Sequence, residues 1–529
     1  MIKLKSEPQR PPRRRRRRRL LLLVMLVAVA ALLAERWRGE WTLRKWKNEM
    51  AAKGEVFDAK ALWPAAGTGS VEFSNQLAQA AANSRGRLGL YASQMSAIVV
   101  QEPGKARRGS QEPQPLLSRK DGSTNTWLDL DALLQQSQTS LNALRELTKN
   151  PPPTMGCDVV KCLGDDSFPN FIAVRLGAQV LCAAAINDLH KGDLTAAAQD
   201  LGALLSFAKL YENDPGLVNY MIRIAIIGLS VDVCWDALQA KGWTEPQLAA
   251  LQKQCVDTSR LLSQMPRTLE NERCERIYML DWFRSHSYET WVARNRQLYE
   301  PFGCQPPAAD TAAPVRRWRQ WVFHPVWSFA WADQEELEYL EHEQPEIMAV
   351  REAVEHHSWL RLKEQIAANR RDYHAPAATW RFYVRLPLVD DFGDTVGGAK
   401  APVAAYPYPD FSKAYLTAMK NLTLHEMVIT AIAIKRFELS HGKPPSNLAD
   451  LTPSLLPAPP RDLMDGQPLR YRLNPNRSYT LYSVGEDGRD DDGIAVSESA
   501  AQSSDTASPW NGRDWLWPHL VAANKRPPG

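Results

Sequence analysis

One uninterrupted apolar run stands out in the hydrophobic pattern, LLLLVMLVAVAALLA at residues 20–34. As a helix it rises about 22 Å, which is short of the roughly 30 Å hydrocarbon core of a bilayer. Arginines before the run and Trp37, Trp41 and Trp46 after it supply side chains that favour the membrane–water interface and make up the difference. The pattern predicts a transmembrane signal anchor over residues 20–37.

The residues before the run set the orientation of this anchor. Residues 1–19 form a basic arm, with ten of the 64 Lys and Arg residues of the chain and one acidic residue. Such an arm stays in the cytoplasm, which predicts a single pass through the inner membrane with the bulk of the chain in the periplasm. A cleaved signal peptide is the alternative, because Ala28-Val29-Ala30 has the form of a cleavage site, but cutting there leaves only residues 20–27 as the apolar core.

Beyond the anchor, apolar positions recur every three or four residues, which is typical of amphipathic helices. Residues 38–165 are predicted to form a helical stalk with a Pro/Gly-rich loop at residues 101–125, and residues 166–385 a helical body. Within the body, Gly192 ends one helix and Asp193 caps the next, which predicts an αα-hairpin. No regular period continues it, so we expect an irregular helical array. Its expected buried positions include Leu201, Leu204, Leu205, Ile222, Ile226 and Leu229.

The last quarter of the chain changes from helical to alternating patterns. Residues 386–411 are predicted to be a linker, and a long core helix follows it. Two short alternating segments, at residues 469–473 and 478–484, predict a β-hairpin. We therefore expect an α+β tail over residues 412–494 and a flexible C-terminus over residues 495–529. The predicted fold class is mainly α, with a single N-terminal transmembrane helix, an irregular α-helical body and a small C-terminal α+β hairpin domain.

Composition narrows the class of protein without indicating a reaction. A hydrophobic share of 44% and a charged share of 23% are ordinary for a globular protein. The net charge of +4 comes from the basic arm, because the chain beyond residue 19 carries 54 basic and 59 acidic residues. A body of that sign lacks the excess of basic residues that displaces counterions from phosphates, so no nucleic-acid partner is expected.

Seven cysteines are too sparse for a disulfide scaffold in a chain of this length. Four of them lie in helix-like stretches, where a small buried thiol is expected. These are Cys182, Cys234, Cys255 and Cys274. Cys157 and Cys162 form the only close pair in the sequence. Two interpretations of this pair are open: a local disulfide and, less favoured, a zinc site.

Motifs that carry catalytic chemistry are absent from the sequence. There is no Gly-x-Ser-x-Gly, no phosphate loop, no dinucleotide fingerprint and no His-Glu-x-x-His. His425-Glu426 begins the last of these motifs but lacks its second histidine. The tryptophan-rich stretch at residues 318–331 is expected to form packed aromatic ridges between helices rather than a ligand platform. No catalytic residue is predicted.

An acidic turn, residues 485–493, follows the predicted hairpin. Its four aspartates, Asp487, Asp490, Asp491 and Asp492, repel one another unless a cation or basic neighbours compensate, and its glycines allow the backbone to bend carbonyls inward. Calcium takes about six to eight oxygen ligands, so these aspartates are candidate calcium ligands, although the spacing is not that of an EF-hand. A solvated hairpin end is the alternative, because water and salt screen exposed charges.

The tail also resembles a known family. A long helix is followed by His-Gly-Lys-Pro-Pro, a Leu-Pro-x-x-Pro-Arg-Asp segment, the hairpin, and Tyr-Ser-Val-Gly-Glu-Asp-Gly with further aspartates. This order is similar to the C-terminal domain of the major pseudopilin of type II secretion, over roughly residues 415–517. The resemblance implies a calcium-binding loop on the same four aspartates. The pseudopilin Gly-Phe-Thr-Leu-x-x-x-Glu processing motif is missing, so an assembled pseudopilin is not expected, and the whole layout resembles bacterial membrane-anchored helical proteins.

The sequence thus favours a membrane-anchored exported protein that acts by binding protein partners, as an interaction or scaffold component. Two alternatives are open. The first is an accessory component of a type II secretion or pilus-like system. The second is an exported hydrolase with a site assembled from scattered residues, which a deep pocket with convergent, perturbed carboxylates or histidines would favour.

Overall fold

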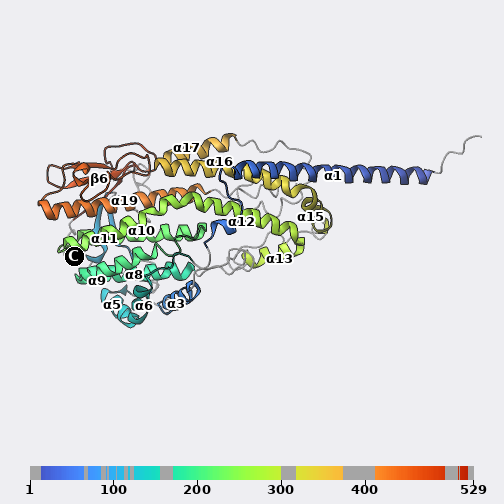
Figure 1. The fold of residues 1–529 in the computed structure, drawn as a ribbon. Helices are drawn as coiled ribbons and strands as arrows, with labels where there is room; N and C mark the ends of the chain where they lie inside the picture. Colours follow the sequence, from blue (N-terminus) through green and yellow to red (C-terminus); the bar gives the residue numbers. More distant parts are fainter. Residues whose placement is uncertain are drawn as a thin grey trace, which may run out of the picture. The chain divides into compact units, whose positions relative to one another are not determined.

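The computed structural model describes most of the chain. The described residues are 13–64, 69–84, 88, 91, 95–102, 104–111, 117–118, 124–154, 171–299, 317–372, 411–494, 510 and 513–521. The fold is mainly helical with a few small sheets, as predicted (Figure 1). The predicted pair Cys157 and Cys162 and the predicted linker before residue 411 lie outside the described residues.

The chain divides into two compact units that do not follow the predicted division into stalk, body and tail. Unit 1 takes Met1–Phe57, Arg273–Gln344 and His374–Pro409. Unit 2 takes Asp58–Glu272, Pro345–Tyr373 and Asp410–Gly529. Two helices, α12 (Met265–Ser285) and α16 (Ala332–His356), pass from one unit into the other.

Unit 1 is built around α1, a single helix from Arg13 to Ala51. Its apolar run is exposed, whereas the turns that follow it pack on the other helices of the unit. Gln334 donates to the Glu35 carbonyl at 2.7 Å, and Gly39 faces the Gln334 side chain so closely that a Cβ would lie 2.9 Å from its Cγ. Glycine at position 39 therefore lets the two helices approach each other.

The tryptophan-rich stretch of unit 1 forms an aromatic cluster, as predicted. Two short π-helical turns, η4 (Arg319–Phe323) and η5 (Trp327–Trp331), flank α15 (His324–Val326), and α13 (Tyr288–Tyr299) packs nearby. Trp327 and Trp331 are buried with Phe283 of α12, and the ring centroids of Phe283 and Trp327 are 4.7 Å apart. Trp321 differs, because 72% of its surface is exposed.

Unit 2 contains the helical array predicted for the body. An αα-hairpin joins α8 (Phe171–Lys191) to α9 (Leu194–Phe207), and Asp193 caps α9 by accepting from Thr195 N and Ala196 N at 3.1 and 3.0 Å. The array continues through α10 (Leu217–Gln239), α11 (Glu245–Thr258) and the 3-10 helix η2 (Ser259–Gln264). Cys182, Cys234 and Cys255 are buried free thiols in this array, and Cys274 of α12 in unit 1 is a fourth, as predicted.

The predicted stalk over residues 38–165 is not a separate unit. α3 (Ser70–Asn83), α5 (Trp127–Gln136) and α6 (Gln138–Leu147) pack against α8, and their leucines share one hydrophobic core with it. The short α2 (Ala59–Leu62) precedes them. The helical pattern was correct, but periodicity alone does not tell which helices share a core.

The loop predicted over residues 101–125 is replaced in part by short strands. Residues 101–125 were expected to be a loop, but β1 (Ile98–Glu102) and β2 (Lys105–Arg108) form a hairpin that turns at Gly104, whose φ is +76°. Two-residue strands, β3 (Leu117–Ser118) and β4 (Thr124–Asn125), pair within the same segment, and the 3-10 turn η1 (Gly109–Gln111) follows β2. Buried Ala106 gives this polar segment its attachment to the core.

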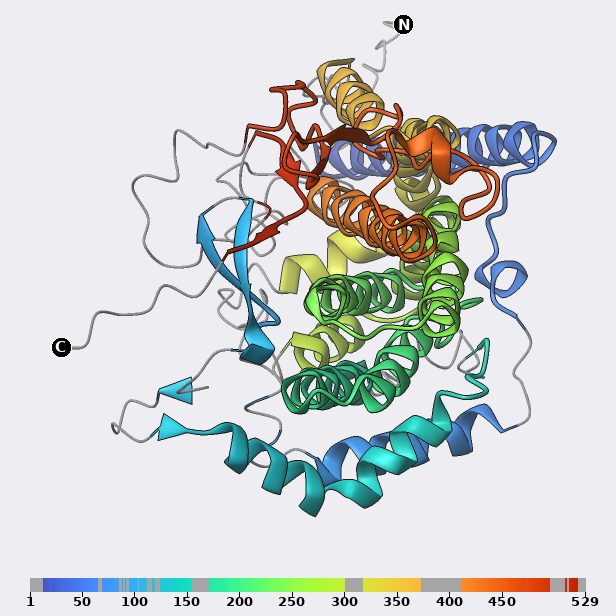
Figure 2. The ribbon, with the colours of Figure 1, turned by 90° about the vertical axis from the view of Figure 1, so that its left-hand side faces the viewer.

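The C-terminus is not flexible over the whole of residues 495–529. β7 (Trp515–Leu516) pairs with β6 (Tyr479–Ser483), and β8 (His519–Leu520) adds a parallel strand to β2 (Figure 2). Trp510, Trp515 and Trp517 are buried, so aromatic side chains fix this segment. The prediction of a flexible C-terminus followed from the Ser- and Ala-rich sequence of residues 495–509 and gave no weight to these tryptophans.

The tail has the predicted helix and hairpin. α19 (Ser412–His441) ends at Gly442, whose φ is +71°, and it is a core helix with fifteen buried residues. β5 (Arg470–Leu473) pairs antiparallel with β6 (Tyr479–Ser483), and a 3-10 turn, η7 (Leu448–Leu451), precedes them. α17 (Trp359–Asp372) lies in the same unit, where Trp359 N and Leu360 N donate to the carbonyls of residues 463 and 464.

Two of the residues predicted to be buried, both on α10, are only partly buried. Leu201, Leu204 and Leu205 of α9 are fully buried, and so is Ile226 of α10. Ile222 and Leu229, however, are only half-buried. The reason is that α10 packs against α8, α9 and α19 together, so its buried surface is wider than a single stripe. This surface takes in Ile224, Ile227 and the charged residue Arg223.

Three helices in the described part of the chain are long and apolar enough to cross a membrane, judged by length and composition. They are the Arg16–Ala51 portion of α1, α8 and α10. The most apolar windows of α8 and α10 are 72% and 56% buried within the fold, whereas that of α1 is 0% buried. Packing in the core therefore accounts for the apolar character of α8 and α10 but not for that of α1.

Candidate functional site

The acidic turn lies beside the hairpin, and its charges have neighbours in the tail. Asp490 accepts from the Tyr482 hydroxyl at 3.0 Å, and its second oxygen lies 3.5 Å from Arg470 Nε. Asp491 lies 3.7 Å from Arg513, and Asp487 accepts from the backbone N–H of Arg489. Basic neighbours therefore compensate part of the negative charge of this turn.

Backbone donors of the acidic turn converge on one more carboxylate, that of Asp514. It accepts from Asp491 N at 3.1 Å and from Gly493 N at 2.8 Å, and burial raises its pKa. A calcium site needs converging oxygens instead. Within the described residues, no group of three or more His, Cys, Asp or Glu side chains is arranged to hold a metal ion. Calcium at Asp487, Asp490, Asp491 and Asp492 thus stays a prediction.

A calcium titration of the detergent-solubilised protein tests this prediction. Binding to the folded state alone is expected to raise the free energy of unfolding by roughly 2.7 kcal/mol at a hundredfold excess over the dissociation constant. The Asp492→Asn variant should lose this gain, and asparagine tolerates the positive φ of residue 492, which is +59°. Magnesium serves as the control. An unchanged melting temperature in millimolar calcium would leave the solvated hairpin end as the correct interpretation.

A larger candidate site lies among the helices of unit 2. We call it the apolar pocket, a cavity of about 450 Å³ between α11, η2, α16, α19 and the proline-rich segment after η7. Its walls are mostly aliphatic side chains and prolines. The lining residues are Val256, Arg260, Leu262, Ser263, Val354, His357, Leu422, Glu426, Ile429, Leu456, Pro457, Ala458, Pro459, Pro460, Arg461 and Leu463.

Glu426 is the only carboxylate among the residues that line the apolar pocket. No hydrogen-bond donor or cation in the described part of the chain contacts this carboxylate. Burial alone raises its pKa to about 7, which agrees with the lack of a neighbouring positive charge. The pocket therefore presents a carboxyl group whose charge has no counterion among the described residues.

His425, the neighbour of Glu426, has a structural role. It is fully buried, and its Nε2 lies 2.8 Å from Thr258 Oγ1 and 2.9 Å from the Cys255 carbonyl oxygen. The Thr258 hydroxyl itself donates to the same carbonyl at 2.7 Å. Burial lowers the pKa of His425 to about 4, so the ring is neutral at ordinary pH. These contacts tie α11 to α19 and do not prepare Thr258 as a nucleophile.

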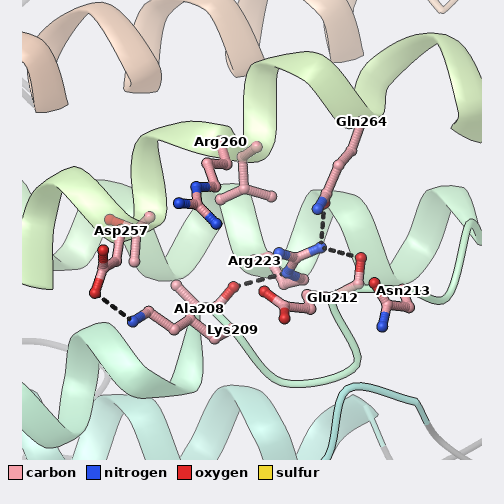
Figure 3. Close-up of a pocket in the computed structure, with 10 residues that line it drawn as sticks. Ala208, Lys209, Glu212, Asn213, Arg223, Asp257, Arg260 and Gln264 are labelled. Carbon is pink, nitrogen blue, oxygen red and sulfur yellow. Dashed lines mark hydrogen bonds and ion pairs between the residues drawn. The ribbon is translucent and has the colours of Figure 1, made fainter.

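A second, smaller cavity of about 170 Å³ lies between the end of α9, α10 and η2, and we call it the arginine pocket (Figure 3). Its lining is mainly polar. It consists of Ala208, Lys209, Glu212, Asn213, Arg223, Asp257, Thr258, Arg260, Leu261 and Gln264. Arg260 lines both this cavity and the apolar pocket. The two pockets therefore adjoin the same segment of unit 2.

Sequence reasoning had named neither pocket, although each left a signal in the sequence. Arg223 is a lone charge within the apolar stretch of α10, and such a residue is buried only with hydrogen-bond partners. Glu426 interrupts the apolar core helix α19 in the same way. From the sequence alone, Glu426 was considered only as part of an incomplete His-Glu-x-x-His zinc motif. The cavities themselves depend on packing that periodicity does not reveal.

Comparisons with known proteins add no family to these observations. No family model matches the chain, and no curated protein or solved structure matches it. The resemblance of the tail to a pseudopilin domain therefore remains a prediction from the sequence.

Proposed function

We propose that this protein is a membrane-anchored binding protein that takes a basic side chain of a protein partner into the apolar pocket. The observation that carries the proposal is Glu426, a carboxylate that has no counterion in the described part of the chain and that lines a mostly apolar cavity. Glu426 is half-buried, and a charge withdrawn from water in this way is costly unless it is paired. A partner that supplies an ammonium or guanidinium group removes that cost on binding.

The walls of the pocket fit the rest of such a side chain. Lysine and arginine carry three or four methylene groups below the charged end, and these pack well against aliphatic surface. Leu422 and Ile429 of α19 and the proline-rich segment at residues 456–460 supply that surface. Arg260 and Arg461 also line the cavity and can contact acidic groups of the same partner. The role of an accessory component in a secretion or pilus-like system is a narrower form of this proposal.

A small cation tests the pocket directly. We expect hexylammonium, which reproduces the end of a lysine side chain, to bind the solubilised protein in isothermal titration calorimetry. The uncharged 1-hexanol should bind more weakly, because it lacks the positive charge that pairs with Glu426. Glu426→Gln should weaken hexylammonium binding at least tenfold, because it removes the charge and keeps the shape. The exposed Glu364→Gln on α17 is the matched control.

Two results would contradict this function. One is equal binding of hexylammonium and hexanol, which would make the pocket a hydrophobic cavity without charge recognition. The other is unchanged hexylammonium affinity in the Glu426→Gln variant.

We also propose that α1 anchors the protein in the inner membrane through residues 20–37, with the basic arm in the cytoplasm and the body in the periplasm. Side chains of the apolar run are exposed along the helix, with exposed fractions of 47% to 69% from Leu20 to Val29 among the large residues. Such a surface needs lipid around it. Further exposed apolar side chains lie in the same unit at Trp321, Val322 and Phe329, and Arg36 of α1 sits over the Phe329 ring at 4.9 Å.

The expected topology can be measured with a reporter. Alkaline phosphatase fused after residue 529 should be active, and green fluorescent protein at the same position, exported through the same route, should be dark. Replacing the arginines at positions 13–19 by alanine should reduce the fraction with this orientation, because basic residues beside the span set its direction. A mature N-terminus near Ala31 or Glu35 would show that the segment is cleaved and not an anchor.

A further inference from the structure

The arginine pocket contains a buried positive charge, Arg223, that forms no ion pair in the described chain, although the Glu212 and Asp214 carboxylates lie near enough to favour its charged form. Arg223 is 4% exposed and lies on the second turn of α10. Its Nε donates to the Ala208 carbonyl at 2.7 Å, and Nη1 donates to the Glu212 carbonyl at 3.5 Å and to Gln264 Oε1 at 2.7 Å. All three acceptors are neutral. In the described chain, no ion pair forms at Arg223, and its Nη2 donates to no acceptor.

A structural role explains only part of this arrangement. A guanidinium that caps the carbonyls at the end of α9 stabilises that helix terminus. This use occupies Nε and Nη1 and leaves Nη2 and the positive charge. Buried charges are normally paired. Figure 3 shows the Arg223 guanidinium between Gln264 and the turn at residues 208–213, within the set of residues that line the cavity.

The other charged residues that line the pocket are Lys209, Arg260, Glu212 and Asp257, so together with Arg223 the cations outnumber the carboxylates by three to two. Lys209 is directed to Asp257, with Nζ 3.4 Å from Oδ2, and Asp257 also contacts Lys253 at 3.2 Å. Asp257 is thus already paired. Arg260 is exposed, and its side chain has no partner in the described residues. The free donors in the described residues are therefore Nη2 of Arg223 and the exposed guanidinium of Arg260, and both belong to groups that stay positively charged.

We propose that the arginine pocket is an anion site that takes an oxyanion group of phosphate size, with Arg223 as the buried donor and Arg260 as the exposed one. The cavity of about 170 Å³ has room for such a group and excludes a large ligand body. Guanidinium groups suit oxyanions because they offer planar, paired N–H donors. This inference does not depend on the apolar pocket, and it assigns a second ligand chemistry to the same unit.

The test uses inorganic phosphate and the solubilised full-length protein. At constant ionic strength set with sodium chloride, phosphate is expected to raise the melting temperature in a saturable manner, and calorimetry should give a dissociation constant. Arg260→Gln should weaken phosphate binding at least fivefold without changing the melting temperature in chloride, because the residue is exposed. Arg361→Gln, an exposed arginine on α17 outside the pocket, should bind as the original protein does.

Further variants separate this site from a simple salt effect and from the apolar pocket. Arg223→Met should abolish phosphate binding, and Arg260→Gln keeps the test valid if Arg223→Met fails to fold. Glu426→Gln should bind phosphate normally, so failure of one site does not imply failure of the other. Equal effects of phosphate and chloride, or unchanged phosphate affinity in Arg260→Gln, would overturn the proposal.

Discussion

Replacing Arg273 by methionine is expected to lower the free energy of unfolding of unit 1 by about 3–5 kcal/mol. Arg273 is fully buried, donates to Glu55 Oε2 at 3.0 Å and to the Val56 carbonyl at 2.8 Å, and contacts Gln344 at 2.6 Å. Its guanidinium also lies 4.8 Å from the centre of the Phe57 ring. Removing the arginine takes away the cation paired with the buried Glu55 carboxylate, which also accepts from the Gln344 amide at 2.9 Å.

Guanidinium-induced unfolding, followed by tryptophan fluorescence, measures this loss. The double variant Arg273→Met with Glu55→Gln should recover part of it, because the buried carboxylate that lost this cation is then absent. Arg44→Met is the matched control. Arg44 forms an exposed pair with Glu40 on α1, so its loss should cost less than about 1 kcal/mol. A loss below that value for Arg273→Met would show that the buried pair adds little to stability.

The helical part of the fold could be predicted because its signals are local. Periodicity and caps located α8, α9 and the break at Gly192 and Asp193, and the alternation of residues 469–484 located the β5–β6 hairpin. Each of these signals lies within one element or its immediate neighbours. Local sequence therefore carried enough information for element type.

The three-stranded sheet β1-β2-β8 could not be predicted in the same way. Its pairing joins residues 98–108 to residues 519–520, and His519 N donates to the Gly104 carbonyl at 2.8 Å. Strands this short carry little alternation, and the partner lies about four hundred residues away along the chain. A contact at that separation leaves no local pattern.

The candidate sites show the same division between local and long-range information. The acidic turn was visible in the sequence because its four aspartates lie within six residues and three of them are consecutive. Its compensation by Arg470 and Arg513 was not, since these residues come from β5 and from the segment before β7. Glu426 and Arg223 belong to no sequence motif, and the cavity beside each is formed by several segments that are distant in the sequence. Neither cavity could therefore be predicted from local sequence.

The stability of the protein is expected to fall as pH rises from about 4.5 to about 7 because of Glu426. Burial raises the pKa of this group from 4.5 to about 7 in the folded state, so the folded protein holds its proton more tightly than the unfolded chain. Below about pH 4.5 both states are protonated and this penalty is absent. As the pH rises through the folded pKa the stability is lost, and above about pH 7 the full penalty remains. Its size is on the order of 2 kcal/mol, allowing for water in the pocket.

Glu426→Gln should remove this dependence, because glutamine has the same shape and no charge at any pH. We expect the variant and the original protein to unfold at nearly the same denaturant concentration at pH 4.5, and the variant to be more stable by about 2 kcal/mol at pH 8. Glu364→Gln, on the exposed side of α17, should leave the pH profile unchanged. The same charge makes a binding prediction: hexylammonium affinity should increase between pH 5.5 and 8 in the original protein, since only the ionised carboxylate attracts the cation. Identical pH profiles of stability for Glu426→Gln and the original protein would show that Glu426 is ionised at little cost, and the proposed pairing with a basic partner would lose its physical basis.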